Sequence, residues 1–258
     1  MKKKYWLLFL PLLIVACNEL EDEAFETDQL SSTIDISIED FVWEEGMTRT
    51  SASITNSGVK FSWSSNDTIS IYPDQGSQVE FLAQSSNNEM TTATFDGGAW
   101  ALKQGHTFCA FYPYSFYNRT SDNIKLTYSG QQQTGNGNIS DACQKDYIYA
   151  PSEGVVNGKT QFTFKHLGAF LYLELTMPEA TTYTSVSLYS RKQVFPLRQQ
   201  LNLSSGQPKI IDLEISNEFT LNLQNISLSS KGEKLIVAMF LPTVTLSGEK
   251  IYCISRLA

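Results

Sequence analysis

Histidines, cysteines and paired carboxylates are the side chains that could carry out chemistry in this chain of 258 residues. His106 and His166 are widely separated, and neither has a Cys or a second His at the spacing of a metal site. No Gly-x-Ser-x-Gly motif is present, and Gly135-Asn136-Gly137 is too short to cradle a phosphate. Carboxylates are scattered over predicted turns, and no pair is singled out for glycoside cleavage. The sequence therefore predicts no enzyme, no cofactor and no metal, and both histidines are interpreted as structural.

Cys17 is the residue whose surroundings indicate a specific modification. Residues 1–17 read MKKKYWLLFLPLLIVAC, with a positive start and an apolar run that is short for a membrane span, which needs about 20 residues. This order is typical of a signal peptide. Because Ile14-Val15-Ala16-Cys17 resembles the lipobox of bacterial lipoproteins, Cys17 is predicted to carry acyl chains such as palmitate and to anchor the chain in the outer membrane. The alternative is a signal peptide whose cleavage site contains a cysteine by chance.

The other three cysteines do not form a recognisable set. Cys109, Cys143 and Cys253 are an odd number at irregular spacing, so neither a disulfide framework nor a zinc site follows. A bridge between Cys109 and Cys143 stays open at this point, beside the alternative that these are buried thiols.

The formal net charge of −8 is concentrated in one segment. Residues 18–48 contain eleven acids and no base, whereas residues 49–258 contain 16 acids and 16 bases. A neutral body without a basic patch argues against nucleic acid as a partner. Residues 18–32 are predicted to be a solvated acidic tether, followed by a first strand.

Alternation of apolar and polar residues indicates short strands along the whole chain. In residues 33–43, Ile34, Ile36 and Ile38 alternate with polar residues, which predicts a strand with one buried face. Similar strands follow to residue 255, around a polar loop at 129–146, and no window shows helical spacing. We expect an all-β protein with two antiparallel β-sandwich domains, residues 49–158 and 159–258.

Aromatic residues cluster around residues 108–117, and tryptophans stand at positions 43, 63 and 100. They could form a surface on which sugars stack. Alternation within Phe108-Cys109-Ala110-Phe111-Tyr112 favours core packing for most of them instead. Exposure of Trp63, Trp100, Tyr114 and Tyr117 would separate the two interpretations.

Several motifs occur in a characteristic order: FSWSSNDTISIY, TATFDG, CAFYPYS, LTYSGQQQ, DYIYAPS and FTFKHLGAFLYLEL. In this order they resemble the fimbrillin-like lipoproteins of the Bacteroidetes, over residues 59–175. The resemblance implies two tandem transthyretin-like sandwiches, display on the cell surface, and assembly with other subunits into fimbriae. It also implies strand exchange, in which a protease cuts after an arginine, the N-terminal strand leaves, and a strand of the next subunit fills the groove.

Arg49 is the arginine that both the resemblance and the charge pattern indicate as the site of cleavage. It is the first base after the signal peptide, so a cut there would release the strand with Ile34, Ile36 and Ile38 together with all eleven acids. The alternative is an uncut Arg49 and a permanent strand, as in an anchoring or accessory subunit.

The C-terminus departs from the family pattern, because the chain stops at Ala258 without the longer segment that supplies a donor strand. Three explanations stay open: the last strand is the donor, the protein is a cap, tip or accessory subunit, or the reading frame is short.

The expected function is that of a structural or adhesive fimbrial subunit on the cell surface, with other subunits and a host or glycan ligand as partners. The alternative is a surface lipoprotein that binds glycans through aromatic residues.

Overall fold

The computed structural model describes most of the chain after residue 62 and three short segments before it. The described residues are 33–38, 53–55, 58–60, 63–84, 92–98, 102–103, 105–138, 140–154, 160–244, 246 and 248–258. Cys17, Arg49, Trp43 and Trp100 lie outside them, as does the predicted acidic tether.

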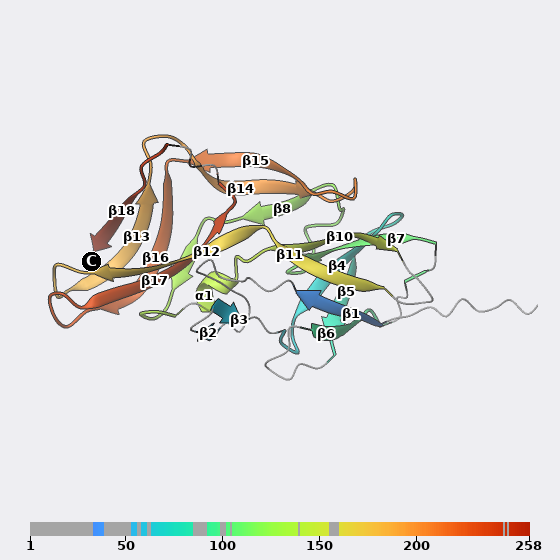
Figure 1. Cartoon of the computed structure of the whole chain (residues 1–258), viewed down its shortest axis with the longest axis horizontal. Coiled ribbons are helices and arrows are strands. Elements are labelled where there is room, and N and C mark those ends of the chain that lie inside the picture. The colour runs from blue at the N-terminus through green and yellow to red at the C-terminus, as the bar shows by residue number, and fades with distance from the viewer. Residues whose placement is uncertain are drawn as a thin grey trace, which may run out of the picture.

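The described residues are nearly all β-strand, which confirms the all-β prediction (Figure 1). Seven strands form a closed barrel in the order β1-β11-β10-β7-β4-β5-β6. Their bounds are β1 Thr33–Ile38, β4 Thr68–Pro73, β5 Val79–Ala83, β6 Thr92–Asp96, β7 Thr107–Tyr112, β10 Ile148–Gly154 and β11 Gln161–His166.

The remaining strands form smaller sheets. β12 (Gly168–Thr176) pairs with β17 (Lys234–Pro242), and β2 (Ser53–Thr55) pairs antiparallel with β3 (Gly58–Lys60). Two further sheets have the orders β18-β13-β16-β9 and β15-β14-β8. The bounds of these strands are β8 Ile124–Thr127, β9 Gln131–Gln133, β13 Thr182–Tyr189, β14 Phe195–Asn202, β15 Lys209–Ser216, β16 Glu218–Ser227 and β18 Tyr252–Leu257.

The polar segment at residues 129–146, predicted to be a loop, contains two of these elements. β9 pairs in parallel with β16, and the four-residue helix α1 (Ser140–Cys143) follows it. The short β9 was missed because its sequence is Gln-Gln-Gln, which shows no alternation of apolar and polar residue types.

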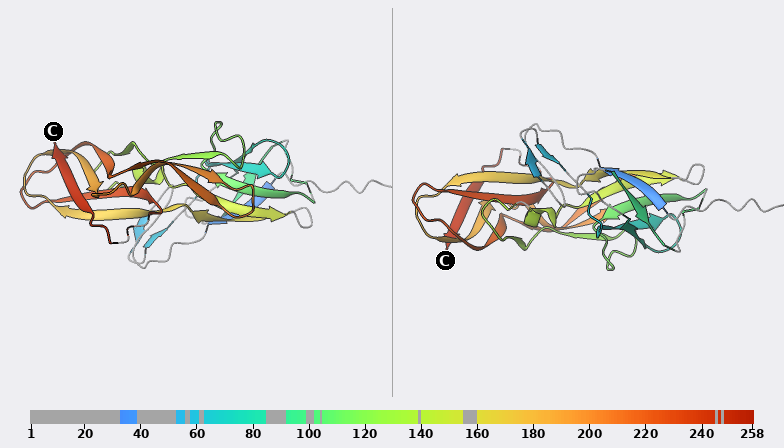
Figure 2. Two further views of the ribbon diagram at one scale, coloured as in Figure 1. Left: turned by 90° about the horizontal axis from the view of Figure 1, so that it is seen from above. Right: turned by 90° about the horizontal axis from the view of Figure 1, so that it is seen from below.

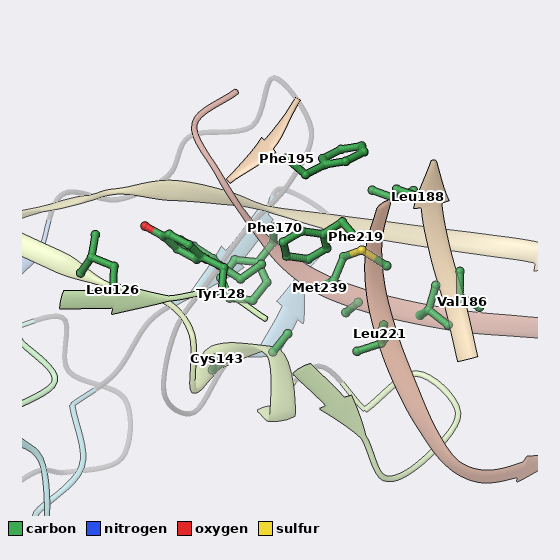
Figure 3. Close-up of a cluster of buried hydrophobic side chains, with 14 of the residues drawn as sticks. Leu126, Tyr128, Cys143, Phe170, Val186, Leu188, Phe195, Phe219, Leu221 and Met239 are labelled. Carbon is green, nitrogen blue, oxygen red and sulfur yellow. The ribbon is translucent and has the colours of Figure 1, made fainter. Parts of the chain in front are cut away.

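Two hydrophobic clusters fill the molecule. The first occupies the barrel and is centred on Trp63, and the second lies among the remaining sheets, as Figure 3 shows around Tyr128, Phe170 and Met239. Figure 2 shows that the two parts lie end to end in an elongated molecule.

β7 explains how the two clusters are joined. Its Phe108, Ala110 and Tyr112 belong to the barrel cluster, while Cys109 and Phe111 belong to the second cluster. A strand buried on both faces needs a continuous apolar run, and TFCAFY is such a run. The core role predicted for the aromatic residues of this strand, Phe108, Phe111 and Tyr112, is therefore confirmed.

The predicted division into two domains near residues 157–159 stays a prediction, since those residues lie outside the described part. Strand pairing crosses this point in both directions. β11, after it, completes the barrel, whereas β8 and β9, before it, pair with β14 and β16.

Candidate strand-exchange site

β1 is the strand that closes the barrel (Figure 1). It pairs in parallel with β11, from Asp35 opposite Gln161 to Ile38 opposite Phe164, and antiparallel with β6. A strand between two neighbours satisfies backbone hydrogen bonds on both sides. Removal of β1 would therefore leave β6 and β11 with facing, unpaired edges.

The interior next to β1 is apolar. Ile34 is 2% exposed, and its antiparallel partner Phe95, like Phe162 and Phe164 on β11, is fully buried. Ile36 and Ile38 occupy strand positions opposite Phe162 and Phe164, which places their backbone as predicted, and their side chains lie outside the described part. A groove left by β1 would thus have an apolar floor that suits alternate apolar side chains of an incoming strand.

Trp63 forms the centre of this floor. Its ring makes edge-to-face contacts with Phe95, Tyr112 and Phe164 at centroid distances of 5.0, 5.3 and 5.9 Å. The Tyr112 hydroxyl donates a hydrogen bond to Asp67 Oδ1 at 2.8 Å, and the Ser64 N–H donates to Asp67 Oδ2 at 2.6 Å. The Trp and Asp of the FSWSSND motif therefore organise the barrel interior and the turn that leads to β4.

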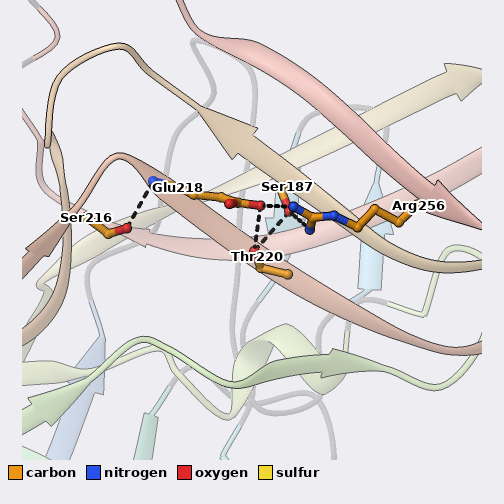
Figure 4. A network of polar contacts seen from close by, with 5 residues as sticks. All are labelled: Ser187, Ser216, Glu218, Thr220 and Arg256. Carbon is orange, nitrogen blue, oxygen red and sulfur yellow. Dashed lines mark hydrogen bonds and ion pairs between the residues drawn. The ribbon is translucent and has the colours of Figure 1, made fainter.

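β18, the C-terminal strand, lies at a sheet edge, where its described pairing is with β13. All six of its side chains are exposed. Arg256 reaches from β18 to the neighbouring strands, where its guanidinium donates to Glu218 Oε1 at 2.6 Å and to Ser187 Oγ at 3.0 Å (Figure 4). Ser187 in turn shares a 2.9 Å hydrogen bond with Thr220. This network ties the exposed C-terminal strand to its own subunit.

Acid is expected to loosen this attachment. The hydrogen bond from Arg256 holds the pKa of Glu218 below its usual range. A lowered pKa means that the charged carboxylate stabilises the attachment above the ordinary Glu pKa, about 4.3, and that this contribution is lost as the pH falls through the lowered value. Both side chains are partly exposed, so the effect is below about 1 kcal/mol. Amide hydrogen exchange of β18 relative to β17, followed from about pH 5 to about pH 3, measures it.

Glu218→Gln is the matched control for this titration. It keeps the shape of the side chain without the ionisable group, so its β18 amides should show no additional acid step. Equal acid dependence in the two proteins would contradict the assigned role of the ion pair.

The sequence did not predict a structural role for three amide side chains that bind the backbone of β17: Gln131, Gln133 and Asn136. Gln131 Nε2 donates to Phe240 O at 2.7 Å, and Gln131 Oε1 accepts from Phe240 N at 2.8 Å. Gln133 makes the same kind of pair with Ile236 O (2.8 Å) and Ala238 N (2.9 Å), and Asn136 with Lys234 O (3.0 Å) and Ile236 N (2.7 Å). We call this set the amide ladder.

The amide ladder supplies the backbone of β17 with hydrogen-bond partners, as a neighbouring strand would. It pairs backbone groups on the edge of β17 that faces away from β12, so that edge is closed by side chains. The signal in the sequence was the repeated glutamine, because Gln131 and Gln133 lie on the same face of β9 and are buried, while Gln132 is exposed.

Each histidine lies beside an aspartate, and of the three described cysteines Cys109 and Cys143 are buried and Cys253 is exposed. His106 Nδ1 lies 2.8 Å from Asp74 Oδ1 near the surface, and His166 Nδ1 lies 3.0 Å from the buried Asp146 Oδ1. Burial raises the pKa of the Cys109 thiol to about 12, which removes its nucleophilic form at neutral pH. No disulfide joins the described cysteines, and no cluster of three or more metal-binding side chains occurs among the described residues.

A sugar-stacking surface was the alternative to core packing for the aromatic residues, and the described rings divide between the two. Trp63 is fully buried, which removes it from any sugar-binding surface. Phe116 and Tyr117, in contrast, are 60% and 89% exposed on the loop after β7, with Arg119 4.4 Å above the Phe116 ring.

The family of the chain is shown by its similarity to known proteins. A model of the fimbrillin-like family matches residues 48–244, most of the chain. The chain belongs to the fimbrillin-like family. The matched region begins one residue before Arg49, so β1 lies outside it. No curated protein matches the chain.

Solved structures resemble the fimbrillin-like chain in fold. A candidate cell adhesion protein from Bacteroides uniformis aligns with a TM-score of 0.52 and 15% identity, covering 88% of this chain and 80% of that one. Another candidate cell adhesion protein, from Bacteroides ovatus, aligns with a TM-score of 0.51 and 14% identity, covering 88% of this chain and 83% of that one.

Membership of the fimbrillin-like family supports a role as a fimbrial subunit of a cell-surface appendage. Within the described part of the chain, none of the helices is long and apolar enough to span a membrane.

Proposed function

We propose that this protein is a structural or adhesive subunit of cell-surface fimbriae, exported as a lipoprotein through acylation of Cys17 and assembled by strand exchange in its barrel. A cut after Arg49 would separate β1 from the rest of the chain, and a strand from another subunit would take its place. Its partners are then other fimbrial subunits, and the outer membrane holds the uncut form through lipid.

The observation that carries this proposal is the position of β1. It is the barrel strand that lies outside the family match, it precedes Arg49, and it is held between β6 and β11 by backbone pairing and one apolar face. An incoming strand could reproduce both interactions, since main-chain hydrogen bonds supply affinity and apolar pockets supply register.

Strand replacement can be tested with a variant that carries a site-specific protease sequence in place of residues 47–51. After cleavage, we expect a labelled peptide of residues 33–43 to exchange into the barrel. The uncut protein should not take it up. A control peptide with Asp in place of Ile34, Ile36 and Ile38 should also fail, because it would bury charge in the groove.

The natural processing is tested separately by N-terminal sequencing of surface-extracted protein. A start at residue 50 is expected for an assembled subunit, and the variant Arg49→Ala should keep its original start. An intact start at Cys17 on assembled fimbriae, together with no peptide uptake, would exclude strand exchange for this chain.

The exposed Phe116–Tyr117 pair favours a second candidate function, glycan binding. Aromatic rings and a nearby arginine can stack on sugar rings and bind their hydroxyl groups. If this loop binds glycans, Tyr117→Ala should lower binding to a polysaccharide array by about tenfold, a loss of about 1.4 kcal/mol. Unchanged glycan binding by the Tyr117→Ala protein would contradict glycan binding by this loop and would not affect the proposed fimbrial role.

A further inference from the structure

Two edge strands carry most of the large hydrophobic side chains that are exposed in the described part of the chain. Of eleven large hydrophobic side chains that are exposed in the described residues, seven lie on β15 and β18. They are Ile210, Ile211, Leu213 and Ile215 on β15, and Tyr252, Ile254 and Leu257 on β18. Each strand ends its sheet, β15 beside β14 and β18 beside β13. Apolar edge strands of this kind are templates for pairing with another chain.

The two edges lie on opposite sides of one ribbon. β13 continues into β14 through residues 190–194, and β15 continues into β16 through Asn217, so the pairs β13–β16 and β14–β15 form a bent two-stranded ribbon (Figure 1). β18 borders the β13 side, whereas the open edge of β15 is on the β16 side. A molecule with different edges on opposite sides is suited to head-to-tail contacts.

Charge disfavours pairing of β15 with another β15. In a symmetric antiparallel pair, residues on the same face stand opposite each other. A pair centred on Asp212 puts that carboxylate opposite its own copy, and a pair centred on Leu213 puts Asp212 opposite Glu214. Like charges directly opposite each other are destabilising. A pair centred on Ile211 avoids this but keeps only residues 209–213 of β15 in the ladder.

The C-terminal strand offers the complementary pattern. An antiparallel register with Glu214 opposite Lys250 also places Ile210 opposite Ile254 and Leu213 opposite Ile251. A register shifted by four residues places Asp212 opposite Arg256, Ile211 opposite Leu257 and Ile215 opposite Cys253. In both registers aliphatic residues meet on the same face, and such cross-strand pairs each contribute about 0.2–1 kcal/mol. The first register adds an acid–base pair through Lys250, whereas the Arg256 of the second register already binds Glu218 of its own subunit.

We infer that β15 of one copy pairs antiparallel with β18 of a second copy. The contact would continue the sheet β16-β13-β18 of one subunit into β15-β14-β8 of the next. Because the two surfaces differ, each subunit can make the contact twice, and the result is an open chain of subunits. This contact lies outside the barrel and requires no cleavage at Arg49, so it goes beyond the strand exchange proposed above.

Oriented cross-linking tests the contact, because Cys253 is already exposed on β18. The first population carries Cys253→Ser with a new cysteine on β15, either Ile211→Cys or Ile215→Cys, which face Cys253 in the two registers. The second population keeps Cys253 and carries a size tag. After mild oxidation of the mixed, uncut proteins, we expect the mixed dimer to exceed both symmetric dimers by at least about tenfold.

A Leu82→Cys, Cys253→Ser protein is the matched control for exposure. Leu82 is 45% exposed like Leu213, but β5 is paired with strands on both sides. Three results would each overturn the inference for both registers. The three dimers could form in statistical amounts, or the symmetric β15 dimer could be in excess. The yield of the mixed dimer could also be no higher than with this control.

Leu213→Lys gives an independent measurement on the same contact. A lysine on an edge strand opposes pairing, and the exposed position should leave the thermal unfolding unchanged. We expect the mixed cross-link to fall by about tenfold, whereas Leu82→Lys should leave it unchanged. Undiminished cross-linking by the Leu213→Lys protein would contradict pairing through this edge.

Discussion

Replacing Gln131 by methionine is expected to lower the free energy of unfolding by about 2–6 kcal/mol. The substitution keeps the length of the side chain and removes its amide, which bonds both the N–H and the C=O of the fully buried Phe240. Each buried backbone group that loses its partner costs about 1–3 kcal/mol. Urea unfolding followed by circular dichroism measures the change.

Gln132→Met is the matched control, since Gln132 is the next residue on the same strand. Its side chain is exposed, and its amide oxygen accepts one hydrogen bond, from Gln224 Nε2 at 2.6 Å. A change within about 0.5 kcal/mol is expected for it. Equal stability of the Gln131→Met and Gln132→Met proteins would show that the amide ladder does not stabilise the fold.

The loss of the amide ladder should also change how the protein associates. Without Gln131 the edge of β17 that faces away from β12 presents unpaired backbone groups, and open edges promote pairing between molecules. Concentration-dependent light scattering of the Gln131→Met protein, relative to Gln132→Met, is expected to rise.

Trp63→Ala is expected to destabilise the barrel by about 3–5 kcal/mol, the usual range for loss of a large buried aromatic side chain. Trp63 is fully buried and contacts Phe95, Tyr112 and Phe164, so its removal leaves a cavity among three rings that other groups hold in place. The Tyr112 hydroxyl, fixed on Asp67, limits how far the barrel can collapse into this space.

Tyr117→Ala removes a similar ring from an exposed position and should change the free energy of unfolding by less than about 0.5 kcal/mol. Both variants can be compared by urea unfolding. A small effect of Trp63→Ala would mean that the barrel closes over the cavity, and the apolar floor assigned to the groove of β1 would then be wrong.

Trp63 and Gln131 lie in different parts of the molecule, so the two substitutions together test whether these parts unfold cooperatively. Trp63 belongs to the barrel cluster, whereas the amide ladder supports the second cluster through β17. The two substitutions share no contact, so their effects should add within about 0.5 kcal/mol if the chain unfolds in one step. Two separate unfolding transitions would instead support the predicted division into two domains.

Local patterns in the sequence were sufficient to predict most strands. Val79–Ala83 was one of the short strands predicted along the chain, and burial in the structure alternates along it. The continuous apolar run in Thr107–Tyr112 is explained by burial on both faces. Strand predictions of this kind succeed because side-chain direction along a strand depends on neighbouring residues. Burial of Thr107–Tyr112 on both faces was not predicted, since alternation was the pattern used there.

The partners of each strand were not predictable in the same way. β1 pairs with β11, from Asp35 opposite Gln161 to Ile38 opposite Phe164, and nothing near residues 33–38 specifies that partner. The glutamines of β9 were visible as a motif, but their role depends on the backbone of β17, more than a hundred positions later. Pairing over such separations depends on the packing of the whole chain.

The sequence by itself determined that this chain is built of strands and that β1 has an apolar face. It also determined that Arg49 is the first base after Lys4 and that eleven acids lie between them. Only the tertiary structure decided that β1 closes a barrel and that side-chain amides close the edge of β17. It alone decided that, among the described strands, β15 and β18 each have one unpaired edge, on opposite sides of a ribbon. Which edges remain open follows from which strands meet, because a backbone edge has the same hydrogen-bonding groups whatever its sequence.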